Sequence, residues 1–183
     1  MSVNATSNDL GWEAPEFNLL DVDNSTKSIE NIKGANGTVI VFICNHCPYV
    51  ISIADRLSFE AKELKKQLIN TVAIMSNDVK KYPDDSYENM KIFSKKYDFQ
   101  FPYLYDKHQD IAKKYSAVCT PDFFGFDKYK TLRYRGRIDN SGLKNDPNVT
   151  RELYLSLKAM KENKIIPFNN PSIGCSIKWK STV

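Results

Sequence analysis

Two cysteines separated by two residues, Cys44-Asn45-His46-Cys47, are the part of this sequence best suited to chemistry. Thiolates are nucleophiles and metal ligands, and a pair at this spacing can close a disulfide. His46, when protonated, would add positive charge beside a thiolate and favour the reduced form. Pro48 follows directly, and proline suits the first turn of a helix, where a missing amide costs least. The motif predicts a redox site, with half of a zinc site or an inert buried pair as alternatives.

A buried strand and an amphipathic helix flank this motif. Residues 38–43 are β-branched or aromatic throughout, as in a strand that is buried on both faces. Between Val50 and Leu68, apolar residues recur mostly at three- and four-residue steps, which predicts a helix. The first amides of a helix and its dipole favour negative charge. We therefore expect Cys44 to be exposed just before the helix, with a pKa below the usual value of about 8.5, and Cys47 to lie close to it.

The rest of the chain predicts an α/β domain. Residues 71–76 form a second buried strand, so that strand, helix and strand make a parallel crossover unit. Helices are expected over 86–97 and 109–115, and a strand hairpin over 124–136. Asp146 and Pro147 would begin a last helix. Residues 1–9 are polar and expected to be a flexible N-terminus, and residues 10–183 form one domain with residues 167–183 as its C-terminal tail.

Composition narrows the class of protein. Hydrophobic residues make up 42% and charged residues 26% of the 183 residues, as in ordinary globular proteins. The net charge of +4 comes from lysines spread along the chain, which indicates no nucleic-acid partner. The sequence contains neither a signal-peptide pattern nor an apolar stretch that would span a membrane. We expect a cytoplasmic protein with no membrane partner and no metal or organic cofactor; the oligomeric state stays open.

These residues together resemble the thioredoxin superfamily, and within it the peroxiredoxin-like (redoxin) branch, which is related to alkyl hydroperoxide reductase and thiol-specific antioxidant proteins. The resemblance covers about residues 10–162. The resemblance rests on residues 14–19, residues 42–50 around the two cysteines, Thr120-Pro121-Asp122-Phe123 and residues 132–139. It implies a thioredoxin-like three-layer fold, in which helices flank a mixed central β-sheet, with an N-terminal extension.

The resemblance also implies an activity and roles for single residues. The first cysteine of such a pair attacks and the second resolves, which gives Cys44 and Cys47 these roles. Thr120 and Pro121 would form a cis peptide facing the cysteines, and the backbone before the proline would pair with substrate. The implied activity is thiol–disulfide exchange with protein or small-molecule disulfides and thiols, and an external dithiol would reset the pair.

The sequence departs from true peroxiredoxins ahead of the cysteines. Those proteins carry a proline and a threonine seven and three residues before the reactive cysteine. Counted from Cys44, these positions hold Gly37 and Val41, and counted from Cys47 they hold Ile40 and Cys44. A thiol peroxidase (antioxidant) is therefore the second function to consider.

Four further residues have two interpretations each. Arg137, and with it Arg135, could steady a peroxidatic thiolate or be an ordinary solvated charge on a strand. Cys119 could be an accessory thiol near Thr120 or a small buried apolar residue. Cys175 could be a second resolving thiol or an exposed free thiol.

A third function is Cu(I) binding by an assembly factor that uses the two cysteines and a histidine, because soft thiolates suit this ion. The histidine outside the motif is His108, which nothing in the sequence marks as a ligand.

Overall fold

The computed structural model describes residues 2–5, 9–144, 146 and 148–181 of the chain. No helix in these residues is both long and apolar enough to cross a bilayer. The elements in chain order are β1 (Ser2–Asn4), β2 (Asn18–Asp21), β3 (Thr26–Ser28), α1 (Ile29–Ile32), β4 (Gly37–Phe42), α2 (Pro48–Lys66), β5 (Ile69–Met75), the short 3₁₀ helix η1 (Pro83–Asp85), α3 (Tyr87–Lys96), β6 (Tyr103–Tyr105), α4 (Asp110–Lys114), β7 (Cys119–Thr120), β8 (Asp122–Asp127), β9 (Leu132–Gly136), α5 (Glu152–Lys161) and β10 (Ile173–Ser176).

The central sheet is mixed, as predicted. Its strands follow the orders β3-β2-β6-β5 and β4-β8-β9. The two parts lie side by side, since β4 contacts β5 and the Ile43 amide donates to the Ile74 carbonyl at 3.0 Å. β5 and β6 are parallel, whereas β8 is antiparallel to both β4 and β9. The predicted strand–helix–strand unit is β4-α2-β5, and the predicted hairpin is β8-β9.

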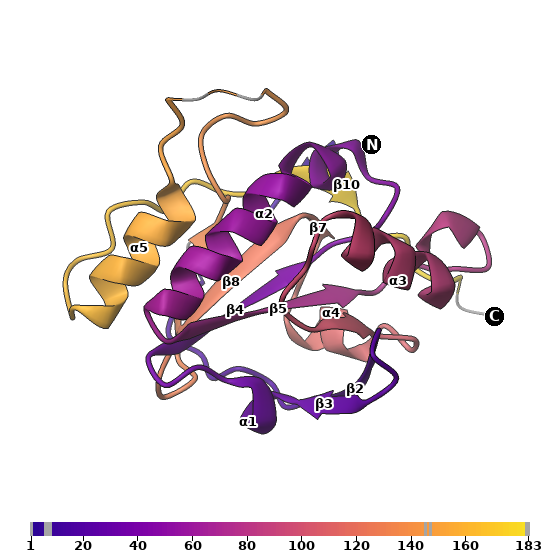
Figure 1. Ribbon diagram of the computed structural model, residues 1–183, viewed down its shortest axis with the longest axis horizontal. Coiled ribbons are helices and arrows are strands. Elements are labelled where there is room, and N and C mark those ends of the chain that lie inside the picture. Colours follow the sequence, from indigo (N-terminus) through magenta and orange to yellow (C-terminus); the bar gives the residue numbers. More distant parts are fainter. Residues whose placement is uncertain (1, 6–8, 145, 147, 182–183) are drawn as a thin grey trace.

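Helices cover both faces of this sheet (Figure 1). Side chains of β4 alternate between the faces. Val39 and Val41 belong to the hydrophobic cluster that also contains residues of α2, α3 and α5. Ile40 and Phe42 belong to the cluster on the other face, with residues of α1 and α4. This three-layer α/β arrangement confirms the predicted fold class, and burial on both faces explains the unbroken apolar pattern of the strand.

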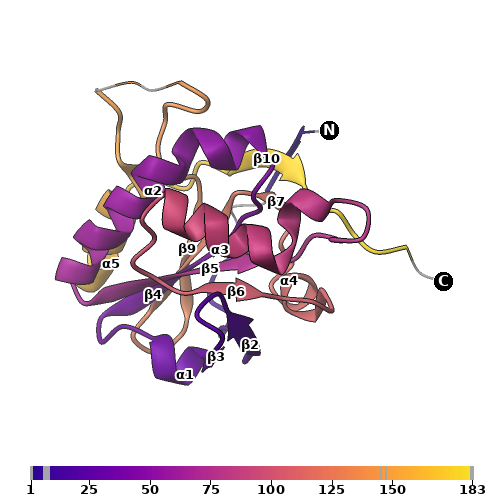
Figure 2. The same ribbon diagram turned by 45° about the vertical axis from the view of Figure 1, so that its right-hand side comes forward.

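A second, small sheet joins the two ends of the chain in the order β1-β10-β7 (Figure 2). Within the segment 1–9, for which we expected flexibility, residues 2–4 form the strand β1 and pair with β10. Residues 1 and 6–8 lie outside the described residues. β10 comes from the C-terminal tail and supplies the edge on which β1 is ordered.

The last helix begins later than predicted. α5 starts at Glu152, whereas Asp146 accepts a hydrogen bond from the Asn148 amide at 2.8 Å in the loop before it. Pro147, which we expected as the first helical residue, lies outside the described residues. The side chain of Asp146 is thus used in a local turn, a common alternative to helix capping.

Candidate active site

The cysteine motif lies where it was predicted, between the end of β4 and the start of α2. β4 ends at Phe42 and α2 begins at Pro48, with Cys47 as the N-cap residue. The first amides of α2 therefore point toward Cys47, while Cys44 lies in the loop before it. The residue at the helix N-terminus is thus the second cysteine, not the first.

Cys44 is enclosed by protein. It is only 1% exposed, and its Sγ lies 3.4 Å from Oγ1 of Thr120. The pKa of Cys44 is raised well above its usual range, chiefly because its thiol donates a hydrogen bond to Cys47. Burial and the nearby carboxylate of Asp85 raise this pKa further. The expectation of an exposed Cys44 with a lowered pKa is therefore wrong.

The surroundings of Cys47 shift its pKa in the direction opposite to that of Cys44. Its pKa is lowered to about 4, chiefly by the hydrogen bond from the Cys44 thiol. The Cys175 thiol and the amides of Val50 and Cys175 also donate to it, and together they outweigh the opposing effect of burial. When Cys47 is protonated, its thiol donates to the Thr120 carbonyl at 3.1 Å.

Cys175 is the third sulfur of the site. It lies in β10, which pairs antiparallel with β7, so that Cys175 is opposite Thr120. Its side chain is half-buried against the cluster that contains Cys44 and Cys47. Partial burial and the hydrogen bond to the Cys47 thiolate raise the pKa of Cys175 to about 11. This position fits the interpretation of Cys175 as a second resolving thiol better than that of an exposed free thiol.

Cys119 has the surroundings of a small buried residue. It is fully buried, and its Sγ lies 3.4 Å from the Pro121 carbonyl. Burial, with a contribution from Asp122, raises its pKa. Although it is next to Thr120 in the chain, the hydrogen bonds that join the other three sulfurs do not include it.

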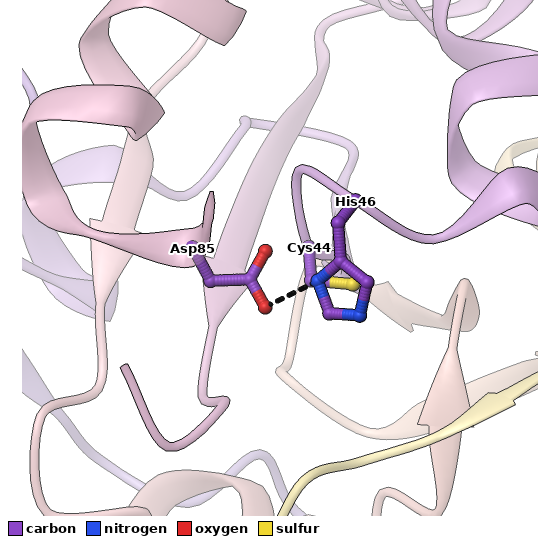
Figure 3. A group of neighbouring side chains, drawn as sticks. All are labelled: Cys44, His46 and Asp85. Atoms are coloured by element: carbon purple, nitrogen blue, oxygen red, sulfur yellow. Dashed lines mark ion pairs between the residues drawn. The ribbon is translucent and has the colours of Figure 1, made fainter. Parts of the chain in front are cut away.

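His46 is held by an acidic residue that the sequence analysis missed. Its Nδ1 lies 2.8 Å from Oδ2 of Asp85, a carboxylate that is completely buried (Figure 3). The imidazole also stacks on the ring of Tyr82, with centroids 5.5 Å apart. Figure 3 shows the Cys44 sulfur next to this imidazole. His46 therefore lies beside the pair, as predicted, but with a buried negative charge as its partner.

Asp85 also organises the loop that carries the first cysteine. Its Oδ1 accepts the amide of Asn45 at 2.8 Å, and its Oδ2 accepts Nδ2 of Asn77 at 2.8 Å. Asn45 in turn accepts the hydroxyl of Tyr103 at 2.9 Å. The sequence placed Asp85 in a polar loop without a motif, so no local signal could have assigned it to the site.

One group of side chains in the described residues could hold a metal ion. Donor atoms of Cys44, His46 and Asp85 lie within 4.8 Å of one another. A thiolate, an imidazole and a carboxylate are all ligands of zinc. The histidine near the cysteines is His46, so the Cu(I) hypothesis that relied on His108 is not supported in that form.

The Thr120–Pro121 peptide is cis, as the resemblance implied. Thr120 contacts both cysteines, through its hydroxyl with Cys44 and through its carbonyl with Cys47. Its backbone, for which we expected pairing with a substrate, is paired instead with Cys175 of β10. The chain itself therefore occupies this edge of β7.

A groove of about 210 Å³ opens beside Pro121, lined mainly by Tyr49, Ile53, Phe123 and Ile138. Arg137 also lines it, but the guanidinium is bound to the Glu152 carboxylate at 3.0 and 2.7 Å. The predicted alternative of an arginine that steadies a thiolate therefore does not describe Arg137, whose charge is already paired.

Arg135 is likewise committed to another site. It is buried, and its Nη2 lies 3.2 Å from Oδ2 of Asp122 and donates to the Ser116 carbonyl at 2.7 Å. Its guanidinium also lies over the Phe124 ring. This ion pair joins β8 to β9 behind the cis peptide.

Comparisons with known proteins agree with this architecture. The family model described as the AhpC/TSA family matches residues 10–135. Over 123 residues the chain is 28% identical to the thiol-disulfide oxidoreductase ResA of Bacillus thuringiensis subsp. konkukian. This match covers 66% of the chain and 65% of the relative, so the chain spans slightly less than two thirds of that protein.

Two solved structures resemble the whole chain. An uncharacterized conserved protein from Geobacillus kaustophilus is 42% identical, with a TM-score of 0.94 over 100% of this chain and 98% of that one. A hypothetical protein from Sinorhizobium meliloti 1021 is 35% identical, with a TM-score of 0.92 over 98% of this chain and 99% of that one. With a family model matching more than half of its length, the chain belongs to the AhpC/TSA family, the redoxin branch that its motifs resemble.

Proposed function

We propose that this protein is a thiol–disulfide oxidoreductase in which Cys44 and Cys47 alternate between two thiols and one disulfide. The observation that carries the proposal is the placement of both cysteines at the start of α2, where each contacts Thr120 directly before the cis proline. A thiolate is the attacking species in disulfide exchange. The relative ResA is named for the same activity.

We infer that Cys47 attacks first, which reverses the order of attack that the resemblance implied. The Cys47 thiolate attacks a disulfide that reaches it, and the other sulfur of that disulfide leaves as a thiolate. Cys44 then loses its proton and attacks Cys47 Sγ, which releases the remaining sulfur and leaves a Cys44–Cys47 bridge. Two electrons pass to the substrate, and an external dithiol reverses the steps. The Cys44 proton passes to the substrate thiolate that leaves. His46, whose Nδ1 lies 2.8 Å from Oδ2 of Asp85, lies near Cys44.

A redox titration tests this function. The protein is equilibrated in glutathione buffers and quenched with acid, and its free thiols are alkylated and mapped by mass spectrometry. Wild type and the control Cys119→Ser should show one Cys44–Cys47 bridge, and Cys44→Ser and Cys47→Ser should lose it. Absence of this bridge, or a reduction potential far below about −300 mV, would contradict the proposal, because a bridge of that potential is structural.

The same samples distinguish exchange from peroxidase chemistry. A peroxidatic cysteine passes through a sulfenic acid, which dimedone traps. With one equivalent of hydrogen peroxide we expect no dimedone adduct on Cys44 or Cys47 before the disulfide forms. A stoichiometric adduct on Cys47 would favour the thiol peroxidase instead.

A further inference from the structure

The three sulfurs of the site differ in their access to solvent. Cys44 and Cys47 are 1% and 0% exposed, whereas Cys175 is partly exposed. Disulfide exchange requires direct contact between the attacking and the attacked sulfur, so its rate depends on access. In the folded chain, a large disulfide can reach Cys175 more readily than either member of the pair.

β10 is built to lie close to the pair. Figures 1 and 2 both show β10 beside the N-terminal end of α2, which directly follows the cysteine motif. Gly174, next to Cys175, allows this approach, because a Cβ there would lie 2.1 Å from the Thr120 carbonyl oxygen. β1 pairs with the other edge of β10. The position of Cys175 beside Cys47 therefore depends on backbone pairing on both sides, not on a loose tail.

We propose that Cys175 is the sulfur that exchanges with external disulfides and thiols, and that it relays the exchange through Cys47 to Cys44. The proposal rests on the function above and adds its entry point. Its physical basis is the placement of the sulfurs: Cys175 is partly exposed and pairs with Thr120 across β10 and β7, the Thr120 carbonyl lies 3.1 Å from Cys47 Sγ, and Cys47 and Cys44 are both buried.

The relay transfers two electrons to the substrate in three exchange steps. The Cys175 thiol passes its proton to Cys47, and the Cys175 thiolate attacks a substrate disulfide. One substrate sulfur leaves as a thiolate and takes up the proton from Cys47, and a mixed disulfide remains on Cys175. The Cys47 thiolate attacks Cys175 Sγ and releases the second substrate sulfur, which forms a Cys47–Cys175 bridge. Cys44 loses its proton and attacks Cys47 Sγ, and Cys175 leaves as a thiolate that takes up a proton. The substrate disulfide has then become two thiols, and the protein holds a Cys44–Cys47 bridge.

The reverse direction uses the acidity of Cys47. The Cys175 thiolate first attacks Cys47 Sγ of the Cys44–Cys47 bridge, and Cys44 leaves as a thiolate that takes up a proton. An external dithiol then attacks the Cys175 sulfur of the resulting Cys47–Cys175 bridge. The sulfur that leaves is Cys47, and a thiol of low pKa leaves faster than one of ordinary pKa. The second thiol of the external dithiol then releases Cys175.

Trapping the first intermediate tests the relay. Cys47→Ser cannot pass the disulfide inward, so a single addition of oxidised glutathione should leave glutathione on Cys175, located by peptide mapping in the Cys119→Ser background. Cys44→Ser should accumulate the Cys47–Cys175 bridge. Glutathione on Cys44 of the first variant, or on Cys47 of the second with Cys175 free, would overturn the proposal.

A rate measurement on Cys175→Ser completes the test. The Cys44–Cys47 bridge should still form at equilibrium in this variant, but its formation by oxidised glutathione should slow by about tenfold or more, because the accessible sulfur is missing. An unchanged rate overturns the relay and leaves the proposed function intact. Absence of the bridge from wild type overturns the proposed function itself, so the two failures are distinguishable.

Discussion

Cys44 and Cys47 are near neighbours in the chain, yet their surroundings shift their pKa values in opposite directions. Cys47 receives hydrogen bonds from two thiols and two amides, whereas Cys44 lies near the buried carboxylate of Asp85. A negative neighbour disfavours a thiolate, and hydrogen-bond donors favour it. The proposed order of attack, Cys47 before Cys44, rests on these contacts.

The acidity of Cys47 can be measured directly. Because its pKa is lowered to about 4, the thiolate absorbance of the reduced protein should rise with a midpoint near pH 4 and not near the ordinary value of about 8.5. Cys47→Ser should remove this transition. Cys44→Ser should move its midpoint upward, because the strongest hydrogen-bond donor is lost; a midpoint unaffected by Cys44→Ser would show that the pair is not coupled as described.

Asp85→Asn tests the charge next to Cys44. Removal of the carboxylate should lower the pKa of Cys44, because the negative charge that disfavours its thiolate is gone. The rate of Cys44 alkylation by iodoacetamide should therefore increase at neutral pH. Asp84→Asn is a matched control, since Asp84 is exposed and takes part in the loop through its backbone carbonyl. Equal effects of the two substitutions would exclude a specific role for Asp85.

Among the elements, β10 covers the edge of β7 that lies beside the cysteine pair. It is four residues long and pairs with β7 at Cys119 and Thr120, directly before the cis peptide. The interval between β10 and β7 is so narrow that position 174 has no room for a side chain. A short strand with one such position can be displaced by a single methyl group.

Gly174→Ala should displace β10 and open the site. The added Cβ would overlap the Thr120 carbonyl, so the strand must shift. We expect Cys47 in the native, reduced protein to be alkylated about tenfold faster or more, because it gains access to solvent and its thiolate remains available. Gly11→Ala is the control: its positive φ of 95° strains an alanine, but no atom lies within 4 Å of the added Cβ. Similar rates of Cys47 alkylation in the two variants would indicate that glycine substitution destabilises the fold as a whole and does not act through β10.

The elements around the pair were predictable from the sequence, while the contacts that tune it were not. β4 and α2 have strong local patterns, and the alternation of Val41 and Phe42 between two clusters accounts for the unbroken apolar run. Asp85 reaches the site through a distant loop, and Cys175 through a short strand whose register is set by Thr120. Such long-range pairings leave no periodic signal in one sequence.

At the scale of the whole molecule, the site lies between the α/β core and the small sheet β1-β10-β7. The core contributes β4, α2 and the loop with Asp85, and the small sheet contributes Thr120 and Cys175. Behind the cis peptide, the buried Arg135–Asp122 pair connects β8 and β9. Both carboxylate and guanidinium are almost completely removed from solvent, so each depends on the other.

Arg135→Met should destabilise the protein by about 3–5 kcal/mol at pH 8, because it leaves the Asp122 charge buried without its cation. Burial already raises the pKa of Asp122 to about 6, and loss of Arg135 should raise it further. When a carboxyl group has a raised pKa in the folded state, the protein loses stability as the pH rises toward that pKa. The loss of unfolding free energy caused by Arg135→Met should therefore be smaller at pH 5 than at pH 8. Urea denaturation of wild type and variant at pH 5 and pH 8 measures this loss of unfolding free energy.

Arg133→Met is the control for this experiment. Arg133 lies on the same strand but is half-exposed, and it pairs with Asp127 at 3.3 Å. Exposed ion pairs contribute about 0–1 kcal/mol. Equal costs for the two substitutions, or a pH-independent cost for Arg135→Met, would show that the buried pair does not act as described.

The pairing of β1 with β10 has a practical consequence for work on this protein. Ser2 is opposite Cys175, and Asn4 is opposite Ile173, so the first residues of the chain flank the strand that holds the outermost sulfur. Purification tags fused ahead of Ser2, or proteolytic trimming of this end, would alter the neighbour of that strand. Thiol reactivities measured on tagged or shortened material should therefore be compared with those of the untagged chain.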